Sequence, residues 1–346
     1  MAAVSEAPAR QRAVDLLVDY LAVARRGSLT ASSEVSRRAI GGDAIGPALV
    51  EGTTARASAE VAALLNGTAA HSLELDDTYE PASLHAGVTV WPAVLALSDE
   101  LGTSALAAVD AGISGYDVAC RLGDRLGPAR AYARGFHPTG VCGVVGAAAA
   151  CAELLGLDER ATEEAMGIAT SLAGGLLAFL DDGAWTKRLH AGRAAEGGIR
   201  AARLAAEGFS GPRDAFTGPH GFLNAFGGAG DASELPDSAR GSGVLGTAVK
   251  LHPCCRYAHG CLDLLLELAP DPDEIDEVSC SVLSAGWTLV AEPIELKRRV
   301  RSPVEAQFSM PFTAALAISR RAVRLEDIER AADLSEELTP LMGRIA

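Results

Sequence analysis

The segment 183–192, GAWTKRLHAG, brings three cationic or titratable side chains together: Lys187, Arg188 and His190. Glycines lie at both ends of the segment, and we expect a turn that presents these groups. Such a cluster can bind carboxylates or phosphates. A solvated basic loop has the same composition, so the choice depends on whether other segments carry complementary chemistry.

The segment 66–85, NGTAAHSLELDDTYEPASLH, supplies carboxylates and histidines. A helix that continues through it would place four polar side chains on or near one face: His71, Glu74, Asp77 and Thr78. Asp76 would point away from that face as a solvated acid. For Asp77, a solvated position at a helix end and a functional carboxylate are both open.

Two more histidines are predicted to lie in loops that precede helices. His85 follows Pro81, in a position where an imidazole can act as an acid or a base. His137 lies in RGFHPTG (134–140), where Thr139 is expected to cap the next helix. A helix N-terminus favours a bound anion, and we therefore favour a functional His137 over a packed imidazole in a capping turn.

The segment 250–259, KLHPCCRYAH, is rich in groups that contact carboxylates: Lys250, His252, Arg256 and His259. Cys254 and Cys255 raise the alternative of a metal site, but their spacing does not match zinc or iron–sulfur ligands, and we expect no metal. A buried small thiol is the favoured interpretation of Cys254. Together the four segments suit the removal of a proton alpha to a carboxylate, with cations holding the other carboxylates.

The overall composition and charge limit the classes of molecule that this protein is expected to bind. The chain has 346 residues and a formal net charge of -15, which argues against nucleic acid because phosphate binding needs a basic surface. We expect no secretory signal, since Asp15 and Asp19 interrupt the apolar residues near the start, and we expect no membrane span, since the longest apolar run is too short. Seven cysteines in mostly apolar surroundings indicate reduced, buried thiols. We therefore expect a cytoplasmic protein with a small carboxylate substrate.

Helices rich in alanine and leucine must position these groups. Apolar residues at helical spacing predict helices over 10–26, 56–75, 91–101, 105–122, 140–156, 160–180 and 193–207. The segment 227–246, rich in Gly, Ser, Asp and Pro, predicts a junction between domains. We expect an all-helical domain over 1–235 and a second domain over 245–346.

The second domain combines helix and strand patterns. The sequence predicts a helix over 257–268, a strand over 274–283, and a helix over 303–319 that Pro311 disturbs in the middle. A short charged helix is expected at the end. This order predicts an α+β domain.

The same segments resemble the MmgE/PrpD family, which includes 2-methylcitrate dehydratase, cis-aconitate decarboxylase and iminodisuccinate epimerase. The matching motifs, in family order, are NGTAAHSLELDDT, RGFHPTGVCGVVGAAAA, DDGAWTKRLHAG, GFSGP and KLHPCCRYAH. The resemblance covers nearly the whole chain. It implies a mainly α fold with an all-helical N-terminal domain and a smaller α+β lid domain. It also implies a homodimer, no cofactor, and an active site in the cleft between the domains.

The resemblance assigns roles to residues of this sequence. The expected catalytic residues are His85, His137, Lys187 and Asp77, with the two histidines as the acid and base candidates. The residues expected to bind substrate are Glu74, Thr78, Arg188, Cys255, Arg256 and His259. Lys187 and Arg256 would hold substrate carboxylates.

This sequence departs from the family pattern at three site positions. Glu74 stands where many members have Asp, Cys255 where the decarboxylase branch has His, and Phe312 where many members have Tyr. The chain is also expected to be shortened at its C-terminal end relative to the family. The histidine lost at Cys255 weakens a decarboxylase assignment.

We therefore expect a lyase that dehydrates its substrate, like 2-methylcitrate dehydratase. Alternatives are an epimerase, isomerase or decarboxylase acting on a similar carboxylate, and a catalytically impaired helical homologue. A metal-dependent hydrolase is a more distant alternative.

Overall fold

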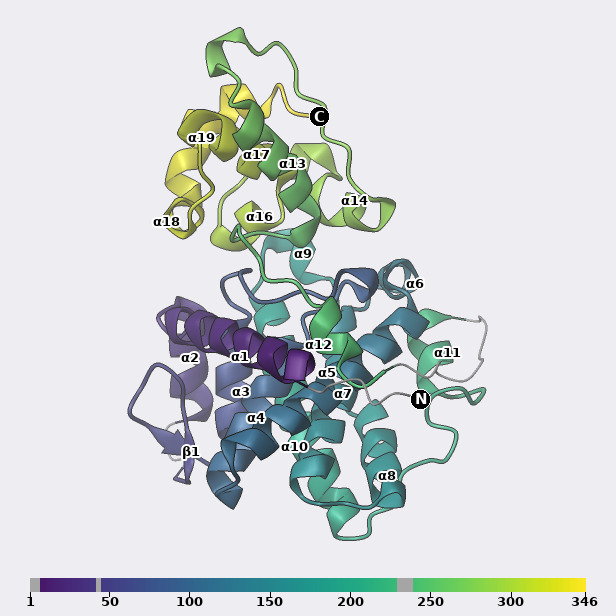
Figure 1. Cartoon of the computed structure of the whole chain (residues 1–346). Helices are drawn as coiled ribbons and strands as arrows, with labels where there is room; N and C mark the ends of the chain where they lie inside the picture. Colours follow the sequence, from purple (N-terminus) through teal and green to yellow (C-terminus); the bar gives the residue numbers. More distant parts are fainter. Residues whose placement is uncertain (1–6, 42–44, 229–238) are drawn as a thin grey trace. The chain divides into compact units, whose positions relative to one another are not determined.

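The computed structural model describes residues 7–41, 45–228 and 239–346, and these are mainly α-helical (Figure 1). The sheet in this part of the chain has two antiparallel strands, β1 (Ala48–Leu49) and β2 (Arg56–Ala57). The predicted mainly α fold class is thus confirmed. No helix in the described ranges is both long and apolar enough to cross a bilayer.

The described residues form two compact units. The first comprises Met1–Ser72, Asp76–Leu177 and Thr186–Val249, and the second comprises Leu73–Leu75, Ala178–Trp185 and Lys250–Ala346. Two short segments that lie before residue 186 in the sequence therefore pack with the C-terminal part. The predicted junction over 227–246 lies in part outside the described residues, which resume at residue 239.

The first unit is a bundle of helices. Its elements are α1 (Ala7–Gly27), α2 (Ala31–Ile40), α3 (Ala59–Ala70), η1 (Glu80–Ala82), α4 (Gly87–Leu101), α5 (Ala105–Leu126), α6 (Pro128–Ala133), α7 (Pro138–Leu154), α8 (Glu159–Thr170), α10 (Thr186–Ala206), α11 (Phe222–Gly227) and α12 (Ser242–Gly246). Helix α10 packs against α3 and α7, and α5 packs against α7. These helices hold the segments that carry His71, His137 and Lys187.

Small residues allow the central helices to approach closely. A Cβ atom added at Gly192 of α10 would lie 2.1 Å from the carbonyl oxygen of Leu64 in α3. A Cβ atom added at Gly198 would lie 2.4 Å from the Cβ atom of Ala147 in α7. The abundance of Gly and Ala in the sequence therefore serves helix–helix contacts.

Several helix boundaries differ from the prediction. The helix predicted over 56–75 is shorter, because α3 ends at Ala70. The helix predicted over 160–180 is interrupted, since α8 ends at Thr170 and a separate short helix, α9 (Phe179–Asp182), follows. Helix α10 begins at Thr186, seven residues before the predicted start at 193. The cluster of Lys187, Arg188 and His190 is therefore helical, and the predicted turn is wrong.

The second unit is also helical. Besides α9 it contains α13 (Arg256–Leu268), η2 (Pro272–Glu274), α14 (Ser284–Val290), α15 (Ile294–Lys297), α16 (Pro303–Gln307), α17 (Met310–Arg320), α18 (Leu325–Glu329) and α19 (Ala331–Met342). Helix α17 packs against α13 and α19. Phe312, on α17, is fully buried. The predicted helix over 303–319 is two helices, because Ser309 caps α17 and Pro311 lies in its first turn, where proline is tolerated.

The strand predicted over 274–283 is wrong. The segment forms a single parallel bridge between Val278 and Ile345, and the Cys280 amide donates to the carbonyl oxygen of Ala346. The backbone hydrogen bonds of this segment are made by Val278 and Cys280, with Arg344 and Ala346, and they form one bridge rather than a strand in the described part of the chain. Alternation of apolar residues therefore does not suffice to form a strand at this position.

Candidate active site

The end of α3 determines how the carboxylates after it are arranged. Helix α3 ends at Ala70 with His71 as its C-cap, and Glu74 adopts a left-handed backbone conformation with φ of 55°. The predicted helical face shared by His71, Glu74 and Thr78 is therefore wrong. Thr78 instead exchanges backbone hydrogen bonds with Ala248, so a tertiary contact fixes this segment outside a helix.

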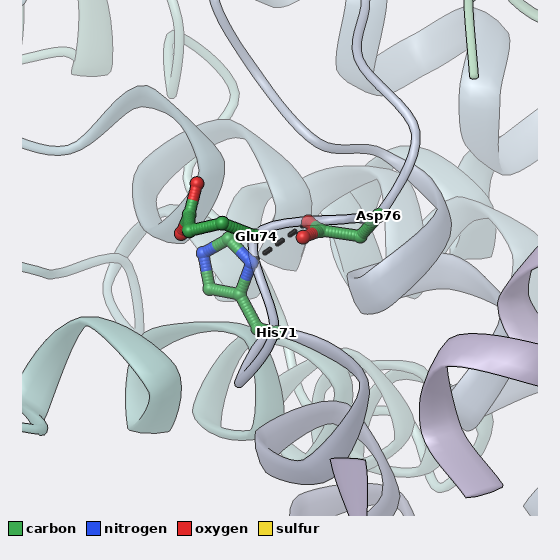
Figure 2. A group of neighbouring side chains, drawn as sticks. All are labelled: His71, Glu74 and Asp76. Carbon is green, nitrogen blue, oxygen red and sulfur yellow. Dashed lines mark hydrogen bonds and ion pairs between the residues drawn. The ribbon is translucent and has the colours of Figure 1, made fainter. Parts of the chain in front are cut away.

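Asp76 is buried rather than solvated, which corrects the prediction that it points away. Its side chain is 1% exposed, and its Oδ2 atom lies 2.8 Å from Nδ1 of His71 (Figure 2). The same oxygen lies 3.3 Å from Nδ1 of His85. The Asp76 carboxylate therefore contacts two histidines of the first unit, His71 and His85.

Four imidazoles of the first unit form what we call the histidine row: His85, His71, His137 and His190. The ring centroid of His71 lies 5.2 Å from that of His85 and 5.6 Å from that of His137. The rings of His71 and His137 are stacked. His137 and His190 share a hydrogen bond of 3.2 Å between their Nδ1 atoms. Proton donors and acceptors thus lie in contact along the row.

The tautomer of His85 follows from its neighbours. Its Nδ1 atom lies 2.7 Å from the carbonyl oxygen of Asp77 and 3.1 Å from Oγ1 of Thr78. A carbonyl oxygen only accepts hydrogen bonds, so Nδ1 carries the proton. In the neutral ring, Nε2 therefore keeps its lone pair and can act as a base.

His137 lies at the start of α7, as predicted, but the capping differs. His137 itself is the N-cap residue and Pro138 occupies the first helical turn, so the predicted cap at Thr139 is wrong. Oγ1 of Thr139 instead accepts a hydrogen bond of 3.1 Å from the amide of His85. A Cβ atom added at Gly175 would lie 3.0 Å from the ring of His190, so the absence of a side chain there makes room for the row.

Lys187 and Arg188 are both buried in the first turn of α10. Arg188 donates a hydrogen bond of 2.8 Å to Oγ of Ser32. Burial, followed by the charge of Lys187, holds the pKa of His137 well below its usual range. Burial, together with His71 and Lys187, lowers the pKa of His190 to about 4. Both rings are therefore neutral near pH 7, beside a buried ammonium group.

Asp77 belongs to a different buried network. Its Oδ1 atom accepts a hydrogen bond of 3.1 Å from the Gly87 amide, and its Oδ2 atom accepts one from the Tyr116 hydroxyl. Tyr116 in turn accepts a bond of 3.0 Å from Nε1 of Trp91. Burial raises the pKa of Asp77 to about 7, and the bonds from Tyr116 and Gly87 oppose that rise. A catalytic role for Asp77 stays a prediction.

The second unit contains its own cluster of polar groups. Nζ of Lys250 lies 3.1 Å from Oε2 of Glu74, and both side chains are almost fully buried. On α13, Arg256 donates to Nδ1 of His259 at 3.2 Å. Burial, followed by the charge of Lys250, lowers the pKa of His259 to about 3. Cys255 is buried next to these groups, and its amide donates to the carbonyl oxygen of Gln307.

One set of potential metal ligands occurs within six consecutive residues: His71, Glu74 and Asp76 (Figure 2). Their ligand atoms lie within 4.8 Å of one another, and one imidazole with two carboxylates could hold a divalent ion. However, the Glu74 carboxylate is already paired with the Lys250 ammonium. A cation at Glu74 would have to share this carboxylate with an ammonium group, which disfavours a metal ion there.

The structure thus groups the predicted residues by unit. His85, His137, Lys187, Arg188 and Thr78 belong to the first unit, and Glu74, Cys255, Arg256 and His259 belong to the second unit. The site prediction omitted His71, Asp76 and His190. A signal was available, because all three lie within the same motifs as the predicted residues.

Comparison with known proteins identifies the family. Residues 2–235 match the model of the MmgE/PrpD N-terminal domain, and residues 252–346 match that of the MmgE/PrpD C-terminal domain. The chain is 32% identical over 287 residues to a cis-aconitate decarboxylase-like protein from Aspergillus oryzae, which covers 78% of this chain and 59% of that protein.

Two further relatives are named cis-aconitate decarboxylase. The human protein is 38% identical over 168 residues, covering 46% of this chain and 34% of its own. The Aspergillus terreus protein is 29% identical over 273 residues, which cover 75% of this chain and 55% of that protein. This chain therefore spans less than two thirds of the length of these relatives. With both domain models matched in order, the chain belongs to the MmgE/PrpD family.

Proposed function

We propose that this chain supplies the proton-transfer groups of a cofactor-independent lyase acting on a di- or tricarboxylate. The observation that carries the proposal is the histidine row beside buried Lys187. Neutral imidazoles can accept and donate protons near neutral pH, and a buried ammonium group pairs with a carboxylate. These are the two requirements of proton transfer next to a carboxylate.

The neighbours of each group suggest its role. His85, whose Nε2 keeps a lone pair, is the proposed base, and neutral His137 is the proposed proton donor. Lys187 would hold a substrate carboxylate. Asp76 and His71 are proposed as positioning residues, because Asp76 contacts the rings of both His71 and His85.

Decarboxylation of a cis-aconitate-like substrate is the reaction that the names of the relatives favour. In this reaction the bond to one carboxyl carbon breaks and carbon dioxide leaves. The electron pair stays on the carbon skeleton, which takes a proton from an imidazole, and water restores that proton. Lys187 would hold a carboxylate that is retained.

Dehydration is the second candidate, and Cys255 is the observation that favours it. By the family resemblance, the decarboxylase branch has a histidine at this position, and the buried Cys255 provides no imidazole there to transfer a proton. In dehydration, the base removes a proton alpha to a carboxylate, the hydroxyl leaves as water after protonation, and a double bond forms.

A proton NMR time course in deuterated buffer tests the proposal. The substrates are cis-aconitate, 2-methylcitrate, citrate and an aspartate-derived dicarboxylate, with carbon dioxide release followed in parallel. New vinyl signals that appear together with released carbon dioxide indicate decarboxylation. New vinyl signals that form from a hydroxyacid without release of carbon dioxide indicate dehydration. Deuterium uptake alone would indicate epimerisation and contradict lyase activity.

The variants compared are a buried cation and an exposed one. Lys187→Met should abolish turnover, whereas Arg160→Met should retain it, because Arg160 is exposed on α8 and pairs with Glu164. Circular dichroism checks that both variants fold. Silence of the folded wild-type chain across the panel, or equal turnover by Lys187→Met, would overturn the proposal.

A further inference from the structure

The second unit contains a cavity that the proposed function does not use. The cavity has a volume of about 130 Å³, and its lining comes from α9, α15, α16 and the residues next to them. All of the lining residues belong to the second unit, and none of them is among the predicted site residues. A cavity of about 150 Å³ can hold benzene, so this one has room for a small organic molecule.

One part of the lining is apolar. Phe179, on α9, and Phe308, directly after α16, contact each other edge to face with ring centroids 5.6 Å apart. Both rings and the side chain of Val304 are buried. Leu180 and Leu296 are the other large apolar residues of the lining. Such a surface favours contact with a hydrocarbon group over contact with a charged one.

A buried ammonium group belongs to the same lining. Lys297, the last residue of α15, is 8% exposed, and its Nζ atom donates a hydrogen bond of 2.6 Å to the carbonyl oxygen of Leu289. An ammonium group has three donors, and among the described residues no carboxylate lies within ion-pair distance of this one. Burial lowers the pKa of Lys297 to about 8, against the charges of Cys255 and Glu305. The group is therefore mostly charged at pH 7, and a carboxylate would stabilise it.

The other charged residues of the lining differ in their pairing. Glu305 accepts hydrogen bonds of 2.7 Å from the amide and from the guanidinium of Arg301, so these two charges already pair with each other. Arg299 and Asp181 are exposed, and neither side chain has a hydrogen bond or an ion pair to the part of the chain that the structure describes. Arg299 attracts an anion, whereas Asp181 repels a second negative charge. The lining therefore favours a ligand with a single carboxylate.

We propose that this cavity binds a small monocarboxylate with an apolar chain, of the size of a four-carbon acid. The ammonium group of Lys297 donates to the carboxylate, Arg299 adds a second positive charge, and the chain contacts Phe179, Val304 and Phe308. A di- or tricarboxylate would place a further charge against the apolar part of the lining. The ligand therefore differs from the class proposed as substrate, and its cavity belongs to the second unit, whereas the histidine row belongs to the first.

Ligand-observed NMR titrations of the full chain test the chemical class with four compounds of four carbons each. Butanoate should bind. 1-Butanol lacks the charge, butylamine carries the opposite charge, and succinate carries a second carboxylate, so each should bind roughly tenfold more weakly or worse. No binding of butanoate, or binding of any of the other three compounds as tight as that of butanoate, would overturn the inference.

Variants of the second unit locate the binding at the cavity. Lys297→Met removes the ammonium group and should weaken butanoate binding roughly tenfold or more. Val304→Phe fills the cavity and should weaken it as strongly, whereas Arg299→Met, at an exposed position, should weaken it roughly two- to fivefold. Arg324→Met is the matched control, because Arg324 is an exposed cation of the same unit outside the lining, and it should bind like wild type.

Lys187→Met separates this cavity from the proposed active site. The variant should bind butanoate like wild type, because Lys187 belongs to the first unit. Loss of binding in Lys187→Met, or unchanged binding in folded Lys297→Met, would overturn the inference. Should Lys297→Met fail to fold by circular dichroism, Val304→Phe, Arg299→Met and the four compounds decide. None of these measurements requires turnover, so this inference can fail independently of the proposed function.

Discussion

At the scale of single residues, burial sets the protonation states in the first unit. When folding lowers the pKa of a histidine, there is a pH range between its pKa in the folded chain and 6.5. In this range the unfolded chain binds a proton at that histidine and the folded chain does not. For His190 this contribution to stability is present above pH 6.5 and is lost as the pH falls through about 4. For Asp77, with a raised pKa, the sign is opposite. The two groups are therefore distinguishable by pH.

The first prediction concerns the charge of Lys187. Lys187→Met should raise the pKa of His137 and of His190, because this ammonium contributes to lowering both. Burial is the larger cause, so both values should stay below 6.5. Histidine NMR titrations would measure the shift, with Lys297→Met as a control that leaves both values in place. Unchanged values in Lys187→Met would contradict the arrangement of the histidine row.

The second prediction concerns Asp77. Its pKa is about 7 in the folded chain against 3.8 for an unperturbed carboxyl, so its contribution to stability is present below pH 3.8 and is lost as the pH rises through 7. Asp77→Asn does not titrate. Its free energy of unfolding relative to wild type should therefore increase by roughly 2–4 kcal/mol between pH 4 and pH 8. Most of this increase should occur between the two pKa values, 3.8 and about 7.

Urea unfolding at a series of pH values would measure this difference. At acidic pH the protonated carboxyl of Asp77 and the amide of the asparagine that replaces it each offer one carbonyl acceptor and one donor group, so the variant and wild type should be closest in stability there. Asp181→Asn, at an exposed position, controls for the removal of one charge. A difference between Asp77→Asn and wild type that stays constant with pH would show that Asp77 does not titrate in this range.

At the scale of elements, the close contact between α3 and α10 limits residue size. Gly192→Ala would place a Cβ atom 2.1 Å from a backbone oxygen of α3, which cannot move as a flexible side chain can. We expect a loss of roughly 1–3 kcal/mol in the free energy of unfolding, or more if the helices must separate. Because α10 carries Lys187 and His190, the variant should also disturb the histidine row.

Gly260→Ala is the matched control for this third prediction. Gly260 lies on α13, and an added Cβ atom there would meet nothing within 4 Å. Alanine favours helix over glycine, so this variant should be stabilised by about 1 kcal/mol. Thermal and urea unfolding would measure both variants. Similar effects at the two positions would contradict the role of close packing at Gly192.

At the scale of the whole molecule, the net charge of -15 affects the approach of an anionic substrate. Long-range repulsion is screened as the ionic strength rises, because the Debye length falls from about 30 Å at 0.01 M to about 8 Å at 0.15 M. If the proposed tricarboxylate substrate is correct, kcat/KM should rise roughly two- to tenfold over this range. A fall with salt would indicate instead that local cations govern substrate approach. A monoanionic competitor should respond less than a trianionic one.

The sequence by itself determined the mainly helical fold and the motifs in which the chemistry lies. Helical spacing of apolar residues is a local property, and it predicted α1, α5, α7 and α13 to within a few residues at each end. The resemblance that these motifs carried agrees with the matches to both family models. The sequence motifs also contain the types of side chain needed for proton transfer.

Only the tertiary structure decided which of those side chains meet. The carboxylate of Asp76, rather than that of Asp77, contacts His71 and His85, because α3 ends at Ala70 and the Thr78–Ala248 bridge fixes the next residues outside a helix. The histidine row joins residues from 71 to 190. Burial and long-range hydrogen bonds set these contacts, and neither can be read from local spacing.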